Sequence, residues 1–212
     1  PGFMTVASRK DFYVVSIIGA AFGLLLIPIL ENIKPEFWSL NIINALLLVV
    51  GFFIFANFAL TIGGWLGQRM PIIWQFVKYA AVGSLNALLD IGILNLLSVI
   101  FKIYSGVLLA IFNSISIAIA ITNSYLLNRF WSFSAPGKTQ KPLIDKREFF
   151  RFIIVSGITI IFNTAGVYTL TTLIGAPKGV SEPLWENISK LSVAPITIAI
   201  NFLGYKFFVF KP

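Results

Sequence analysis

Six apolar stretches constrain this sequence more than any other feature. A helix needs roughly 20 residues to cross about 30 Å of hydrocarbon, and each stretch is close to that length or longer. They cover residues 12–30, 41–63, 76–100, 104–127, 150–174 and 188–208. Of all residues 58% are hydrophobic and 11% are charged, whereas soluble domains have roughly 45–50% and about 25%. We therefore predict an all-α, polytopic integral membrane protein with six transmembrane helices.

The first stretch has one alternative interpretation, a signal peptide, because Arg9 and Lys10 precede it. It is long for that role, however, and Glu31, Asn32 and Lys34 follow it without a small-residue cleavage site. We expect a retained first helix.

The placement of Lys and Arg predicts the orientation. With six crossings, most of the 16 Lys and Arg residues fall on the side of the two termini. The opposite side keeps Lys34, Lys102, Lys178 and Lys190, together with the acids Glu31, Glu36, Glu182 and Glu186. By the positive-inside rule both termini are cytoplasmic, in the inner (cytoplasmic) membrane of the cell. The net charge of +8 is explained in this way and needs no nucleic-acid partner.

The residue types exclude most chemistry. The chain has no Cys and no His, so disulfides, thiolate catalysis, the usual zinc sites and histidine proton relays are absent. No phosphate-cradling glycine-rich loop and no paired carboxylates occur in the predicted spans. We expect a protein that is not an enzyme and that uses no cofactor and no metal.

An internal repeat follows residue 70. The segment FVKYAAVG at 76–83 is echoed by FFRFIIVSG at 149–157, and SYLLNRFWSF at 124–133 is echoed by NFLGYKFFVF at 201–210. The pattern predicts an N-terminal hairpin in 1–70 and a four-helix core in 71–212, built from two-helix repeats at 74–133 and 149–212 and a basic loop at 134–148. Two such repeats have the same topology, which favours a site between them. The alternative is that any two hairpins with basic ends look alike.

These motifs resemble those of the GtrA-like membrane proteins over about residues 74–210, and the first two helices lie outside the resemblance. It implies a four-helix core and a part in cell-surface polysaccharide or glycolipid assembly. Members are thought to move polyprenyl-phosphate-linked sugars from the cytoplasmic to the outer leaflet. The second copy departs from the first, with Asn163 where Asp90 stands and Tyr205 where Asn128 stands, so the two halves are not expected to be equivalent.

Asp90 is the one acid that we place inside a predicted span. At about 1.5 Å per residue it lies about 18 Å deeper than Lys78, near the middle of the hydrocarbon core. An ionisable group at that depth is a functional hypothesis by default. Asn86, one turn earlier, shares its helix face, and Gly83 leaves room beside it. We predict a head-group track of Asn86, Asp90 and Asn163; the alternative is interhelical packing.

Cations at matched repeat positions suggest a phosphate site. Lys78, Arg129, Arg151 and Lys206 would form a ring at the cytoplasmic interface, and Arg and Lys both bind phosphate well. Ordinary snorkelling anchors at helix ends are the alternative. Gly83, Asn128 and Asn201 are expected to support the two sites.

Three functions remain open. The first is translocation of a polyprenyl-phosphate-linked sugar, passive or ion-coupled, with Asp90 as the proton or cation carrier. The second is a membrane subunit that anchors a glycosyltransferase through the basic loop. The third is a small proton-coupled exporter. Membrane lipid is the expected surrounding in each case, and the sequence is compatible with a homo-oligomer.

Overall fold

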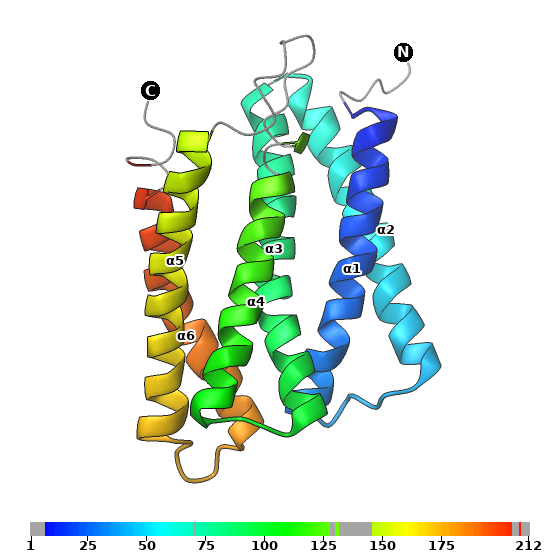
Figure 1. Cartoon of the computed structure of the whole chain (residues 1–212). Coiled ribbons are helices and arrows are strands. Elements are labelled where there is room, and N and C mark those ends of the chain that lie inside the picture. Colours follow the sequence, from blue (N-terminus) through cyan, green and yellow to red (C-terminus); the bar gives the residue numbers. More distant parts are fainter. Residues whose placement is uncertain (1–6, 70, 128–129, 132–145, 205–207, 209–212) are drawn as a thin grey trace. The chain divides into compact units, whose positions relative to one another are not determined.

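A computed structural model of the chain (Figure 1) describes residues 7–69, 71–127, 130–131, 146–204 and 208. These residues contain six α-helices and a π-helical segment, and they contain no strand. The elements are α1 (Arg9–Ile33), α2 (Ile42–Gly67), α3 (Pro71–Phe101), α4 (Gly106–Leu127), α5 (Lys146–Tyr168), η2 (Thr169–Ile174) and α6 (Glu182–Gly204). The predicted all-α fold is confirmed, and every predicted stretch is helical over most of its described length.

The helices differ in how well they suit a membrane. Five segments are long and apolar enough to cross one: α1, α2, residues 76–101 of α3, α4, and α5 with η2. Helix α6 is not among them, and its first three turns carry Glu182, Glu186 and Lys190. The chain is therefore a multi-pass membrane protein. Crossing by α6, and with it the number of six spans and the orientation, stays a prediction.

The distribution of side chains is that of a protein in lipid. Large apolar side chains point outward, among them Ile42 and Phe55, which are 76% and 64% exposed. Buried positions hold amides, hydroxyls and charges as well as apolar groups. In water such an exposed apolar surface would be unusual, whereas lipid tails are as apolar as the leucine side chain. The interior is where polar groups can be satisfied.

The chain forms two compact units, each described here by itself. The first comprises Pro1–Leu96 with Thr122–Ser134, and the second Leu97–Ile121 with Ala135–Pro212. Helices α3 and α4 therefore contribute to both units. The predicted repeats and the predicted boundary at residue 70 do not coincide with these units and stay predictions.

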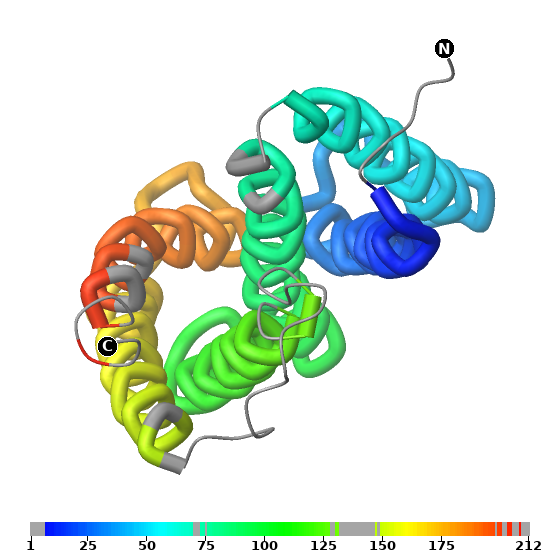
Figure 2. Tube along the Cα trace, turned by 90° about the horizontal axis from the view of Figure 1, so that it is seen from above, coloured from blue at the N-terminus to red at the C-terminus, as the bar shows by residue number. Residues whose placement is uncertain are grey.

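In the first unit α1 and α2 pack backbone against backbone, side by side in Figure 2. A Cβ built on Gly23 would come 2.6 Å from the carbonyl oxygen of Leu48, so only glycine allows this approach. The same two helices are antiparallel, and they are also joined by hydrogen bonds between the hydroxyl of Ser16 on α1 and the side-chain amide of Asn57 on α2. Helix α1 runs parallel to α3. Asp11 contacts Lys78 near the start of both helices, and Asn32 donates a hydrogen bond to Asn95 near their ends. Between them Leu25 packs against Gly92.

In the second unit α5 and α6 are antiparallel neighbours (Figure 2). Gly166 faces Val193, and Gly204 faces Val155, each closely enough that a Cβ would clash. The α5 side of this hairpin ends in the π-helical segment η2, where the indole N–H of Trp185 donates to the carbonyl of Leu170 at 2.8 Å. Close packing along its length brings the polar faces of α5 and α6 together.

Candidate functional site

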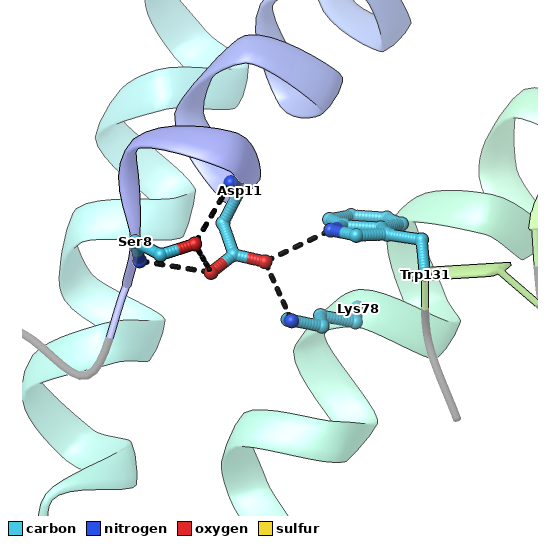
Figure 3. A network of polar contacts seen from close by, with 4 residues as sticks. All are labelled: Ser8, Asp11, Lys78 and Trp131. Carbon is cyan, nitrogen blue, oxygen red and sulfur yellow. Dashed lines mark hydrogen bonds and ion pairs between the residues drawn. The ribbon is translucent and has the colours of Figure 1, made fainter. Parts of the chain in front are cut away.

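A capping box positions the first polar cluster. Ser8 caps α1, and the backbone N–H of Asp11 donates to the Ser8 hydroxyl oxygen at 3.3 Å. In return the backbone N–H and the hydroxyl of Ser8 donate to Asp11 Oδ2 at 2.8 and 2.7 Å. This reciprocal arrangement satisfies backbone donors at the helix start. It also fixes one oxygen of Asp11 and leaves Oδ1 for other partners (Figure 3).

The second carboxylate oxygen of Asp11, Oδ1, forms an ion pair with a lysine from α3. Lys78 Nζ lies 2.5 Å from Asp11 Oδ1, and the indole N–H of Trp131 donates to the same oxygen at 2.9 Å (Figure 3). The Lys78 ammonium also lies 4.9 Å from the ring centroid of Trp74 and 5.5 Å from that of Trp131. The side chains of Lys78 and Asp11 are 13% and 7% exposed. Lys78 is thus paired and enclosed, so any phosphate would have to replace Asp11.

Of the other three predicted phosphate ligands, the structure describes only Arg151. Arg129 and Lys206 lie outside the described residues. Arg151, in the second unit, is half-buried, and its guanidinium carbon lies 5.7 Å from the ring centroid of Phe208. The cationic ring as a whole therefore stays a prediction.

The predicted head-group track is described in part. Asn86 is half-buried on α3 and accepts a hydrogen bond of 2.7 Å from the amide of Asn123 on α4. Asp90 is half-buried within the apolar part of α3. Gly83 is exposed, and a Cβ built on it would meet nothing within 4 Å; its part in the track stays a prediction. Asn163 belongs to the second unit.

The two asparagines that were expected to support the track are not described at their side chains. Asn128 lies outside the described residues, and Asn201 is placed only as part of α6. Their roles stay predictions.

The second unit contains a polar cluster that we call the α6 lysine cluster, made of Lys190, Asn113, Asn163, Thr164 and Thr197. Lys190 Nζ donates to the amide oxygens of Asn113 at 2.5 Å and Asn163 at 3.3 Å. The amide N–H of Asn113 donates to Asn163 Oδ1 and to Thr164 Oγ1, both at 3.1 Å. Asn163 in turn donates to Thr197 at 3.3 Å. Three helices, α4, α5 and α6, thereby meet at a lysine that is 2% exposed.

A carboxylate lies one helical turn before this lysine. Glu186 is fully buried and accepts a hydrogen bond of 2.8 Å from the hydroxyl of Ser98, near the end of α3. Residues four apart share a helix face, so Glu186 and Lys190 both point into the second unit. Burial raises the pKa of Tyr104, in the connection between α3 and α4, and the negative charges of Glu186 and Glu182 raise it further.

Two acids that the sequence analysis left outside the predicted spans are buried in helices. Glu186 precedes the predicted span 188–208, but α6 begins at Glu182, so Glu186 lies within a helix. Asp11 precedes the predicted span 12–30 by one residue and lies within α1. That Asp90 is the one acid inside a span stays a prediction. The Ser8–Asp11 spacing of a capping box and the Glu186–Lys190 spacing of one turn were the signals that could have revealed them.

Among the described residues, no group of three or more His, Cys, Asp or Glu side chains could hold a metal ion. The first cluster is a closed ion pair held by a hydroxyl and an indole, whereas the α6 lysine cluster joins a lysine to amides and hydroxyls.

Comparisons with known proteins add the family. Neither the curated proteins nor the solved structures include a match to this chain. The family model described as GtrA/DPMS, transmembrane domain matches residues 78–210, which is well over half of the chain. It begins at Lys78 and includes the whole α6 lysine cluster, while α1 and α2 precede it. The resemblance to the GtrA-like membrane proteins is thereby confirmed, and the chain belongs to the GtrA/DPMS transmembrane domain family.

Proposed function

We propose that this protein moves a polyprenyl-phosphate-linked sugar across the cytoplasmic membrane for the synthesis of a cell-surface polysaccharide or glycolipid. It would do so without catalysing a reaction. The observation that carries the proposal is the family match over 78–210, because the family is linked to membrane proteins in glycosylation and lipid-linked sugar processes.

The physical problem of such transport is the head group. A phosphate and its sugar cannot cross hydrocarbon unaided, because charged and polar groups lose their hydration there. The polyprenyl tail can remain in the bilayer throughout. Polar groups part-way along apolar helices lower this barrier, and α3 offers Asp90 and the hydrogen-bonded Asn86 within the apolar segment 76–101.

Reconstitution tests the proposal. Liposomes that contain the purified protein and labelled undecaprenyl phosphate glucose are treated with a membrane-impermeant reagent that destroys the sugar on the outer surface. Translocation makes the whole pool reactive, whereas protein-free liposomes keep the inner half. The change Asp90→Asn is expected to slow translocation about tenfold or more, because a charged hydrogen-bonding group is lost from the path.

A matched control removes a carboxylate elsewhere. Glu36 is exposed in the connection between α1 and α2, and Glu36→Gln is expected to leave the rate unchanged. Equal rates with and without protein would refute the proposal. Loss of sugar transfer by a co-expressed glycosyltransferase on charge reversal at Lys138 and Lys141, with no effect of Asp90→Asn, would favour the anchoring role instead.

A further inference from the structure

We infer that Lys78 and the indole of Trp131 form a binding site for the lipid phosphate, and that Asp11 occupies this site as an internal competitor. The inference rests on the proposed function and deepens it, because neither Trp131 nor Asp11 was among the residues expected to act on the lipid. In this arrangement the hairpin of α1 and α2 restrains the family domain until a lipid replaces the carboxylate.

The first argument is the pair of donors that meets Asp11 Oδ1. Lys78 Nζ lies 2.5 Å from this oxygen, and the indole nitrogen of Trp131 lies 2.9 Å from it. An ammonium and an indole N–H can donate a hydrogen bond but cannot accept one. Both groups therefore need an acceptor when they are enclosed, and an anionic oxygen suits the ammonium best. A phosphodiester offers such an oxygen and the same single negative charge as the carboxylate.

The second argument is that the two sides of this contact belong to different parts of the chain. The family match covers residues 78–210 and so includes Lys78 and Trp131, whereas Asp11 precedes it on α1. The cation and the indole of the family domain thus receive an anion from a helix outside that domain. Helix α1 also contacts α3 in its later turns, so it keeps its place along α3 when the contact at its start is exchanged.

The third argument is that both partners keep other contacts when they separate. The second oxygen of Asp11 accepts hydrogen bonds from the backbone N–H and the hydroxyl of Ser8, and a carboxylate in the first turn of a helix is stabilised by the helix dipole. Lys78 keeps the rings of Trp74 and Trp131 at 4.9 and 5.5 Å. Exchange of one anion for another therefore costs much less than removal of Asp11, which leaves the ammonium without an anion.

The surroundings of Lys78 suit a lipid better than a free phosphate ion. Its side chain is 13% exposed, so the ammonium is enclosed without being sealed. Phe76 and Tyr79, which lie on either side of it in the sequence of α3, are 65% and 50% exposed. A lipid with its phosphate at Lys78 can place its tail along such apolar surface. Free phosphate shares the charge but gains nothing from this surface.

Binding measurements on the whole protein in nanodiscs test the inference. The probes are undecaprenyl phosphate glucose, the uncharged lipid undecaprenol and inorganic phosphate. Asp11→Asn keeps the size of the side chain and an acceptor for Ser8, but it removes the competing charge. We expect it to tighten binding of undecaprenyl phosphate glucose about tenfold, to lower the temperature of thermal unfolding, and to leave binding of undecaprenol unchanged. Glu36→Gln, at an exposed carboxylate in the connection after α1, is the matched control and should bind as the parent does.

Opposite changes in affinity and stability distinguish a competitor from a purely structural ion pair, whose loss lowers both. The donors are tested in the Asp11→Asn background. There Lys78→Met should weaken binding about 10- to 100-fold, and Trp131→Phe, which keeps a ring but loses the N–H, about fivefold. Lys10→Met removes an exposed lysine and should have no effect. Unchanged or weaker binding in Asp11→Asn would overturn the inference. Inorganic phosphate that competes at the same concentration as the lipid would overturn the assignment to a lipid.

A measurement that keeps Asp11 covers the case in which Asp11→Asn does not fold. The chain has no Cys, so spin labels attach only where Tyr13→Cys and Phe76→Cys introduce one, at exposed positions of α1 and α3. Saturating undecaprenyl phosphate glucose should lengthen the distance between the labels, because Asp11 leaves Lys78, whereas undecaprenol should not. The same distance with and without bound lipid would contradict the exchange.

The same preparations separate this inference from the proposed function. If Asp11→Asn binds undecaprenyl phosphate glucose more tightly through Lys78 but neither it nor the parent translocates the lipid in liposomes, transport fails and the site stands. If the parent translocates the lipid and Asp11→Asn matches it in both affinity and rate, the proposed function stands and the site fails.

Discussion

Two enclosed lysines, Lys78 in the first unit and Lys190 in the second, lie in different polar surroundings. Lys78 faces a carboxylate, Asp11, whose other oxygen is fixed by Ser8. Lys190 donates to two amide oxygens, and the buried carboxylate of Glu186 lies one helical turn before it. A buried ion pair holds both of its side chains in place, because removal of either partner leaves an uncompensated buried charge. We interpret Lys78 as a tie between α1 and the start of the family domain, and Lys190 as a link between α4, α5 and α6.

Breaking the Lys78 pair is expected to have the largest effect on stability. Asp11→Ala leaves the ammonium of Lys78 enclosed without its carboxylate and also removes the acceptor of Trp131. Loss of one partner of a buried pair costs about 3–5 kcal/mol, and the partial exposure of Lys78 points to the lower end. Chemical denaturation in detergent measures the free energy of unfolding.

A double variant controls for the charge. Asp11→Leu combined with Lys78→Met removes both charges and should recover most of the lost stability, since apolar replacements of a buried pair are often tolerated. At the other lysine, Lys190→Met alone should cost less than Asp11→Ala, because Asn113 stays hydrogen-bonded to Asn163 without it. An equal or larger loss at Lys190 would contradict this ranking of the two lysines.

Helix contacts offer a second, smaller comparison between the units. A Cβ on Gly23 would meet backbone atoms of α2 at 2.6 Å, whereas a Cβ on Gly166 would meet the side chain of Val193 at 2.8 Å. Backbone cannot move aside locally, so we expect Gly23→Ala to cost about 2 kcal/mol and Gly166→Ala about 1 kcal/mol. Thermal unfolding of both variants measures the difference.

Gly51 on α2 is the matched control, because a Cβ there would meet nothing within 4 Å. Gly51→Ala should stabilise the protein slightly, by less than about 1 kcal/mol, since alanine has the higher helix propensity. A loss at Gly51 as large as that at Gly23 would mean that the packing between α1 and α2 is not the cause.

Most of the fold could be predicted from the sequence because it depends on length and apolarity. Each apolar stretch became a helix, and the predicted ends at Leu127 and Ile174 are those observed. The start of α6 was misplaced by six residues. A charged residue marks the end of an apolar helix only when it has no hydrogen-bond partner inside the protein. Glu186 has such a partner in the hydroxyl of Ser98, which is too distant in sequence to be recognised beforehand.

The site was harder to predict for the same reason. Asn163 was identified from its place opposite Asp90 in the repeat, but its contact with Lys190 requires three helices to converge. Asp11 was overlooked because it precedes the apolar stretch by one residue, and its partner Lys78 follows two helices later. Spacing along one helix is readable from sequence, whereas contacts between helices depend on packing that the sequence alone does not reveal.

The smallest expected effect concerns the charge near Lys190. Glu186 lies one turn before this lysine. After burial, its negative charge is the next cause that raises the pKa of Tyr104, so Tyr104 can report on it. Glu186→Gln should therefore lower the pKa of Tyr104 part of the way, with burial keeping it above the ordinary value. Glu182→Gln should lower it less, since Glu182 is the weaker contributor.

The difference in tyrosinate absorbance between each protein and its Tyr104→Phe derivative gives the titration. Because the folded pKa is raised, the stability linked to Tyr104 is present below the unfolded pKa and is lost as the pH rises through the folded one. An unchanged titration in Glu186→Gln would mean that the charge of Glu186 does not act on Tyr104.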